Sequence, residues 1–257
     1  MFLGLDLTGH ADDQRILLAD VGTRLPRRTH PRAAEGKWAA GGPGYCAGMA
    51  STTAAVVLAG GASRRLGHPK QLVLYRDRPL LEHVVQSVLQ WPVDRVVVVL
   101  GAGAEEILEQ VDFGSAVVAI NDDWEEGISS SLRVGLDVLA RDPHADLAFV
   151  VLGDQPGIPL DVPQQLLDAA ENSSRLAIVP VYRYERSNPV LFRRQLWERL
   201  MTLEGDHGAA ELLRAHADWV EEVRVDHLPP RDIDTPSDVA DLTAGGGRHG
   251  GATAASR

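Results

Sequence analysis

Short apolar runs, separated by segments with helical spacing, restrict the fold of this chain more than any other feature. The runs that read as buried strands are Ala54–Leu58, Arg95–Leu100, Ala116–Ile120, Leu147–Leu152, Ala177–Val181 and Val220–Val225. Most of them are apolar on both faces, which is typical of parallel strands that helices cover on each side. We therefore expect an α/β protein with an open, doubly wound, mostly parallel sheet in three layers.

Between these runs, apolar residues recur at the spacing of a helix face. The expected helices contain Leu81–Val88, Leu132–Leu139, Val162–Ala170, Gln195–Leu203 and Ala209–Ala217. Ser129–Ser131 precede the second of these and are expected to cap it. In a doubly wound sheet, ligands bind at the carboxyl ends of the strands. The loops after Leu58 and Leu152 should therefore open onto one edge.

The two ends of the chain differ in composition from its middle. Residues 1–50 are rich in Arg, Gly, Ala and Pro, and within them Arg24–Gly48 has no periodicity and few large apolar side chains. We expect this extension to be disordered or dispensable, apart from a short helix near Gln14–Val21, with Met49 as the native start. The glycine-rich residues 243–257 are expected to form a flexible tail, which leaves residues 51–242 as one folded domain.

The net charge of −11 argues against a nucleic-acid partner and against binding to an anionic membrane surface. The single cysteine, Cys46, excludes an internal disulfide framework and a multi-cysteine zinc site. No apolar stretch approaches the roughly 20 residues that span a bilayer, and the first residues make a poor signal peptide. We therefore expect a cytoplasmic protein.

The segment Val56–Lys70, VVLAGGASRRLGHPK, carries the strongest functional signal. Gly60 and Gly61 follow a buried strand and lack Cβ atoms, so their backbone can approach a ligand closely. Free N–H groups and nearby cations in such a loop suit a polyphosphate. The segment is not a Walker A loop, because Gly67 is followed by His-Pro instead of Lys-Ser or Lys-Thr. A dinucleotide fingerprint after the next strand also fails, because Glu106 occupies the place of its third glycine.

The order LAGGxSxRxGxxK, from Leu58 to Lys70, resembles the signature loop of the MobA/MocA-like nucleotidyltransferases, which include the molybdenum cofactor nucleotidyltransferases. Further segments that resemble this family are Asn121–Leu136, Leu152–Pro156, Asn188–Phe192, Gly205–Ala209 and Asp232–Asp238. The resemblance covers essentially all of Thr53–Leu242. It implies a Rossmann-like nucleotidyltransferase fold for residues 51–242.

The resemblance also implies an activity. Such an enzyme moves an NMP group from an NTP to an acceptor phosphate with Mg²⁺ and releases pyrophosphate. The sequence GDQP with the three serines is closest to the branch that uses CTP and molybdopterin to form molybdopterin cytosine dinucleotide. A GTP-using molybdenum cofactor guanylyltransferase, another small-molecule nucleotidyltransferase and a non-enzymatic nucleotide-binding chaperone remain as alternatives. A transient molybdoenzyme or chaperone partner fits the first of these activities.

The family's roles fall on definite residues of this chain. The resemblance implies catalytic roles for Arg65, Lys70 and Asp154, and nucleotide contacts from Leu58, Ala59, Gly60, Gly61, Ser63, Arg65, Lys70, Asn121 and Ser131. It implies metal ligation by Asp154 and Asp234, with Asp232 as the alternative to Asp234, and acceptor contacts from Asn188, Asp206 and His207. Either Asp232 or Asp234 could instead be a turn or capping residue. Many relatives carry Arg at Ala210 and Gly-His at Ser187-Asn188, so the acceptor is the substrate that these differences concern.

Overall fold

The computed structural model describes residues 51–63, 66–206, 208–233, 235 and 237–238, together with the backbone of Ile16 and Leu17. Expectations for the rest of residues 1–50 and for residues 243–257 lie outside this part of the chain. Among the described residues, no helix combines the length and the hydropathy needed to cross a membrane.

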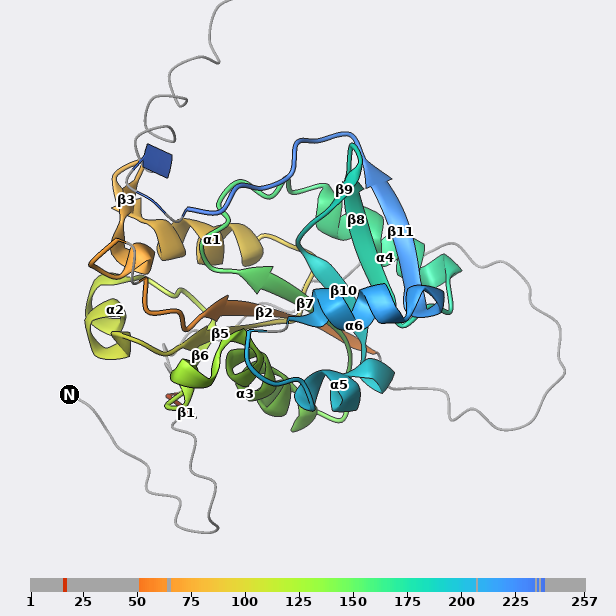
Figure 1. The fold of residues 1–257 in the computed structure, drawn as a ribbon, viewed down its shortest axis with the longest axis horizontal. Coiled ribbons are helices and arrows are strands. Elements are labelled where there is room, and N and C mark those ends of the chain that lie inside the picture. Colours follow the sequence, from red (N-terminus) through yellow and green to blue (C-terminus); the bar gives the residue numbers. More distant parts are fainter. Residues whose placement is uncertain are drawn as a thin grey trace, which may run out of the picture.

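One large mixed sheet organises the molecule (Figure 1), with strand order β1-β6-β5-β2-β7-β10-β8-β11 and β9 paired to β8. The strands are β1 (Ile16–Leu17), β2 (Thr52–Ala59), β5 (Arg95–Leu100), β6 (Val117–Ile120), β7 (Ala145–Leu152), β8 (Ala177–Tyr182), β9 (Glu185–Arg186), β10 (Val190–Arg193) and β11 (Val220–Val225). The pairs β5–β6, β2–β5, β2–β7 and β8–β11 are parallel. All six strands expected from the sequence are therefore present, in a mostly parallel sheet.

Strand β10 departs from the expected pattern. It lies antiparallel between β7 and β8, with Val190 opposite Val150 and Leu191 opposite Ile178. The expected helix near Gln14–Val21 is wrong at Ile16–Leu17, because these two residues pair antiparallel with β6 instead. The chain also forms a small hairpin from β3 (Leu74–Tyr75) and β4 (Arg78–Pro79).

Helices cover both faces of the sheet. They are α1 (Leu80–Val88), α2 (Ala104–Gln110), α3 (Ile128–Ala140), α4 (Val162–Asn172), α5 (Arg194–Met201) and α6 (Ala209–Ala215), with short 3₁₀ turns η1 (Lys70–Leu72), η2 (Trp124–Glu126) and η3 (Ala217–Trp219). In Figure 1, α1 lies above the sheet and α3 and α5 lie below it. The three-layer arrangement expected from the alternating pattern is therefore confirmed, and α2 is an addition to it.

The central strand β2 is buried on both faces because its side chains alternate between two apolar clusters. Ala55 and Val57 pack with α1 and α4, whereas Ala54 and Val56 pack with α3 and α5. Both clusters consist mainly of Val, Leu, Ile and Ala side chains, so burial of apolar surface on each side fixes the strand. This rigid strand ends at Ala59, directly before the glycine loop.

Ser129–Ser131 lie inside the first turn of α3, and Gly127 occupies the N-cap position. The expectation that the serines cap the helix is therefore wrong by two residues. All three serines are buried, because their hydroxyl groups find partners within the protein. The Ser129 hydroxyl donates to the Gly205 carbonyl at 2.8 Å, and the Ser130 hydroxyl donates to the Gly127 carbonyl at 2.8 Å.

Candidate active site

The glycine loop leaves β2 where three elements approach one another closely. A Cβ atom on Gly60 would lie 2.6 Å from the hydroxyl oxygen of Ser131, and one on Gly101 would lie 2.6 Å from the Gly60 carbonyl oxygen. The Ala102 N–H donates to the same carbonyl at 3.1 Å. In contrast, a Cβ atom on Gly61 would meet nothing within 4 Å. Gly60 therefore serves internal packing, and Gly61 lies at open space.

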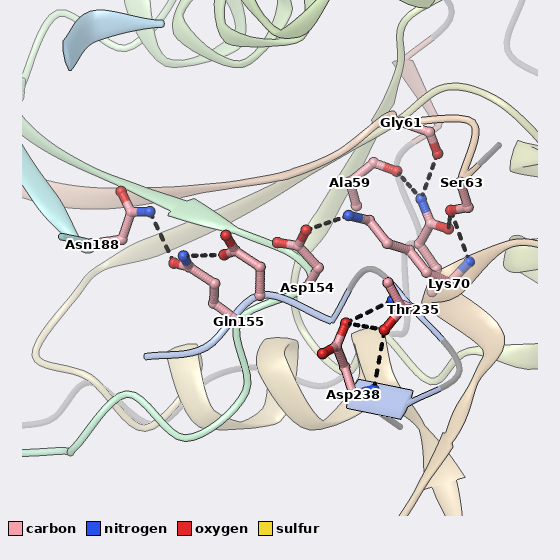
Figure 2. Close-up of polar contacts among 11 residues, drawn as sticks. Ala59, Gly61, Ser63, Lys70, Asp154, Gln155, Asn188, Thr235 and Asp238 are labelled. Carbon is pink, nitrogen blue, oxygen red and sulfur yellow. Dashed lines mark hydrogen bonds and ion pairs between the residues drawn. The ribbon is translucent and has the colours of Figure 1, made fainter. Parts of the chain in front are cut away.

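A buried glutamine holds the loop in shape. Gln71 is 2% exposed, and its Nε2 donates to the carbonyl oxygens of Ala59 at 2.7 Å and Gly61 at 3.1 Å. The Ser63 hydroxyl accepts a hydrogen bond from the Lys70 N–H at 2.9 Å (Figure 2). These bonds fix the turn that aims Lys70 at the cleft. The sequence reasoning missed Gln71, although a polar residue between Lys70 and the apolar Leu72 could have indicated it.

Lys70 and Asp154 form an ion pair although 84 positions separate them in the sequence (Figure 2). Lys70 comes from η1 after the glycine loop, and Asp154 follows the neighbouring strand β7. Both side chains are mostly covered, with 18% and 14% of their surfaces exposed. Burial raises the pKa of Asp154 above its ordinary value of 3.8; the Lys70 charge opposes this shift and the Asp232 charge adds to it.

A second polar chain joins the turn after β7 to the segment that follows β11. The Gln155 Nε2 donates to the Asp232 carboxylate at 2.5 Å, and the Asn188 Nδ2 donates to the Gln155 Oε1 at 2.9 Å (Figure 2). The Ile233 N–H donates to the Asp154 carbonyl at 3.2 Å. These bonds bring Asp232 beside Asp154. At the other end, the Tyr182 hydroxyl donates to the Asn188 carbonyl at 2.8 Å, and burial raises the pKa of Tyr182.

The acidic residues of the closing segment have different surroundings. Thr235 and Asp238 bond each other: the Thr235 N–H and hydroxyl both donate to the Asp238 carboxylate at 2.7 Å (Figure 2). This resembles the reciprocal pattern that starts a helix. Of the described acidic residues in Asp232–Asp238, Asp232 is the one that the polar chain carries to the site.

A first pocket of about 400 Å³ opens at the carboxyl ends of β2 and β7. Its lining is Leu58, Ala59, Gly60, Gly61, Ala62, Lys70, Gln71, Trp124, Glu125, Gly127, Ile128, Ser131, Leu152, Gly153, Asp154 and Asp206. Seven residues expected at the nucleotide or the metal therefore share one wall. Trp124 and Glu125 of η2 line it as well.

Two of the expected nucleotide contacts, Asn121 and Ser63, are absent from the lining of this pocket. Asn121 is 2% exposed, and its Nδ2 donates to the hydroxyl oxygens of Ser130 at 2.8 Å and Ser131 at 3.0 Å. Ser63 bonds the Lys70 backbone. Neither Asn121 nor Ser63 lines the pocket, so the structure gives them contacts that orient Ser131 and Lys70.

A second pocket of about 420 Å³ adjoins the first and shares Leu58, Ile128 and Leu152 with it. Its other lining residues are Ser129, Leu132, Val150, Gln155, Val179, Arg186, Ser187, Asn188, Val190, Phe192, Gly208, Ala209, Ala210, Leu213, Arg214 and Asp232. Of the expected acceptor residues, Asn188 lies here. Asp206 lines the first pocket, because its loop folds back onto Gly127, where a Cβ atom would lie 2.6 Å from the Asp206 carboxylate.

Three expected site residues, Arg65, His207 and Asp234, lie outside the described residues. Within residues 51–63, 66–206, 208–233, 235 and 237–238, no group of three or more His, Cys, Asp or Glu side chains could hold a metal ion. Asp154 and Asp232 are thus two carboxylates without a third protein ligand in that part of the chain. Mg²⁺ often binds in this way, through one or two carboxylates and the phosphates of a substrate.

Comparison with known proteins decides the family. Residues 55–220 match the family described as MobA-like NTP transferase domain. The chain belongs to this family. As a MobA-like NTP transferase it is a nucleotidyltransferase, and its fold is the Rossmann-like fold of that class.

Individual relatives are similar to this chain over most of its length. Rv0371c from Mycobacterium tuberculosis H37Rv superimposes with a TM-score of 0.70 and 31% identity, covering 76% of this chain and 98% of the other. A structure of the same protein in complex with manganese gives a TM-score of 0.66 and 29% identity, covering 75% and 98%. Nicotine blue oxidoreductase from Paenarthrobacter nicotinovorans is 31% identical over 192 residues, which are 72% of this chain and 90% of that protein.

For a MobA-like NTP transferase, the described geometry has a direct chemical meaning. The backbone of the glycine loop and the Lys70 ammonium supply positive potential on one side of the cleft. The Asp154 and Asp232 carboxylates could supply oxygen ligands of the kind that a divalent cation prefers. Such a site can align a triphosphate and neutralise it in a protein with a net charge of −11.

Proposed function

We propose that this enzyme transfers a nucleoside monophosphate from an NTP to the phosphate of a small acceptor, with CTP as the nucleotide and molybdopterin as the acceptor. The observation that carries the proposal is the position of the Lys70–Asp154 pair. Both residues line the first pocket, and Gln155, the next residue, lines the second. An NTP in the first pocket and an acceptor in the second would meet beside this pair.

The proposed bond changes need no general base. An oxygen of the ionised acceptor phosphate attacks the α-phosphorus of the NTP, and the bond from this phosphorus to the bridging oxygen of the β-phosphate breaks. Pyrophosphate leaves with the electron pair. The protein's task is alignment and charge neutralisation. In this scheme Lys70 exchanges the Asp154 carboxylate for a phosphate oxygen when the nucleotide binds.

A divalent cation belongs to the proposal, with Mg²⁺ as the physiological ion. Asp154 would hold it together with Asp232 or Asp234. The effect of the Asp232 charge on the pKa of Asp154 supports Asp232, since the two carboxylates must be near each other to interact. When bound, the ion would neutralise triphosphate charge. The manganese complex of the M. tuberculosis relative makes Mn²⁺ a useful probe.

The choice of CTP rests on the family resemblance and on the position of Ser131 in the first pocket. Ser131, at the start of α3, lines the first pocket, where its hydroxyl could read a base edge. Gln155 of the GDQP sequence bonds Asn188 and Asp232 on the acceptor side, so its support for the cytidine branch comes from the motif alone. GTP therefore remains the competing nucleotide. We place this reaction in the cytoplasm, with delivery of its product to a molybdoenzyme or a chaperone.

Pyrophosphate release tests the proposal. The enzyme is mixed with each of the four NTPs, with Mg²⁺ or Mn²⁺, with and without molybdopterin. We expect release that depends on CTP, the cation and molybdopterin together. Faster release with GTP would overturn the choice of nucleotide. Binding of NTP without release, across molybdopterin, sugar phosphates and alcohol phosphates, would favour the non-enzymatic alternative.

Because one relative is named as an oxidoreductase, a second assay measures redox activity. Oxidation of NADH or NADPH is followed by absorbance with the same protein preparation and a redox dye as electron acceptor. Steady oxidation without any pyrophosphate release would replace the proposed transfer by a redox reaction.

A further inference from the structure

The second pocket is chemically unlike the first. Its walls are mainly aliphatic and aromatic carbon, contributed by β7, β8, β10, α3 and α6; Leu132, Val150, Val179, Phe192 and Leu213 are examples. All five are buried or partly buried in the protein. The carbon surface favours an apolar body, and the polar side chains of the same lining, which include Ser129, Ser187 and Asn188, offer hydrogen bonds at its edge.

Two arginines reach this pocket, and they differ in their partners. Arg186 forms an ion pair with Glu222, and its Nε donates to the Glu222 carboxylate at 2.6 Å. Arg214 lines the same pocket from α6, and no residue in the described part of the chain bonds or pairs with it. A cation beside a ligand cavity, in a protein this acidic, is a ready partner for an anionic group.

Helix α6 starts beside the junction of the two pockets. A Cβ atom on Gly208, just before the helix, would lie 4.0 Å from Ile128, which both pockets share. Arg214, an exposed residue near the other end of the helix, lines the second pocket and not the first. Its guanidinium is therefore available to a ligand of the second pocket alone.

We propose that the second pocket selects a small amphiphilic anion: an apolar ring system against the carbon wall, with an anionic substituent held by Arg214. As an acceptor, this ligand would carry its reacting phosphate at the junction and the second anionic group beside Arg214. The role of this ligand as an acceptor rests on the proposed function. Its binding to the second pocket does not depend on that function, so an experiment can reject the binding and the acceptor role separately.

Two fluorescent probes with the same ring system test the binding. Anilinonaphthalene sulfonate carries one sulfonate on an apolar aromatic body, and phenylnaphthylamine is the same body without it. We expect Arg214→Gln to weaken binding of the sulfonate about tenfold and to leave phenylnaphthylamine unchanged. Arg186→Gln is the matched control, because Glu222 already engages that guanidinium, and it should change neither probe more than about twofold.

A blocking variant locates the probe. Ala210 is an exposed residue of α6 that lines the pocket, and Ala210→Trp should abolish binding of both probes while the thermal midpoint stays near that of the parent enzyme. Unchanged sulfonate binding in Arg214→Gln, or a larger loss in Arg186→Gln, would overturn the assignment of the anion to Arg214. If the probes still bind to Ala210→Trp, they do not bind in the second pocket, and the proposal is wrong. A labelled CTP, titrated in parallel, reports on the first pocket alone.

Discussion

Gln155 donates a hydrogen bond to Asp232 across a sequence separation of 77 residues. The amide of Asn188 in turn fixes the other end of the Gln155 side chain. Gln155 thus holds Asp232 beside Asp154. In the proposed reaction, Gln155 itself contacts neither the nucleotide nor the cation. Groups that orient a metal ligand in this way commonly set its affinity.

We therefore predict that Gln155→Ala weakens divalent-cation binding about tenfold or more. The measurement is a Mn²⁺ titration of the protein with CTP, followed by electron paramagnetic resonance. Gln165→Ala is the control, since the Gln165 amide bonds the exposed Asp161 in the same manner. Equal Mn²⁺ affinities in both variants would show that Asp232 is not held for a metal.

The Lys70–Asp154 pair predicts two variants of similar consequence for transfer. Lys70→Met removes positive charge from the triphosphate side, and we expect a loss of about 10²–10³ in kcat, as for other electrostatic groups at a transition state. Asp154→Asn should lose activity to at least the same extent. Arg78→Met, which removes an exposed arginine from its pair with Glu82, should retain full turnover. Pyrophosphate release measures all three, and normal activity in Asp154→Asn would refute the metal role of that residue.

Because Gly60 lies close to Ser131, we predict that a side chain at Gly60 destabilises the protein, whereas one at Gly61 does not. Gly60→Ala places a Cβ atom 2.6 Å from the Ser131 hydroxyl, and overpacking of this kind costs about 1–3 kcal/mol of unfolding free energy. Gly61→Ala, where the same atom meets open space, should unfold at nearly the parental urea concentration. The double variant Gly60→Ala, Ser131→Ala should recover part of the loss. Additive effects in this cycle would exclude the contact as the cause.

Asp161 predicts a small dependence of stability on pH. Its hydrogen bond with His227 lowers the pKa of Asp161 below the ordinary value of 3.8. A carboxyl group with a lowered folded-state pKa adds stability that is fully present above the unfolded value and disappears as the pH falls through the folded value. The pair is exposed, so the contribution stays below about 1 kcal/mol. Urea unfolding of the parent and Asp161→Asn from about pH 3 to pH 6 should show a difference that grows with pH and levels off above 3.8. A difference that grows as the pH falls would contradict the sign.

The parts of the fold that depend on local pattern could be predicted from the sequence. Apolar runs such as Arg95–Leu100 indicate strands buried on both faces, because short runs rich in valine are typical of parallel strands covered by helices. Strand β10 escaped prediction because four residues after a proline carry little periodicity, and its antiparallel direction depends on how the connection from β9 crosses the sheet. Helix α2 escaped for a related reason: Ile107 is its single fully buried side chain.

The candidate site also has parts that local sequence pattern predicts and parts that depend on tertiary structure. The glycine loop, Lys70 and Asp154 follow strand ends, and the rule for doubly wound sheets places strand ends together. The contacts of Asn121 and Asp206 could not be read from the sequence. Asn121 bonds buried serines that look like solvated caps in the sequence, and Asp206 reaches the first pocket through the return of its loop onto Gly127. Both contacts join elements that are distant in sequence, so they depend on the assembled tertiary structure.

The two adjoining pockets share only Leu58, Ile128 and Leu152 among their described lining residues. Most of the remaining wall of the second pocket comes from one continuous stretch, residues 179–214. If the second pocket holds the acceptor as we propose, substitutions there would change the acceptor that is used and leave the glycine loop intact. A chimera that exchanges residues 179–214 between relatives would test whether this stretch alone determines which acceptor the enzyme uses.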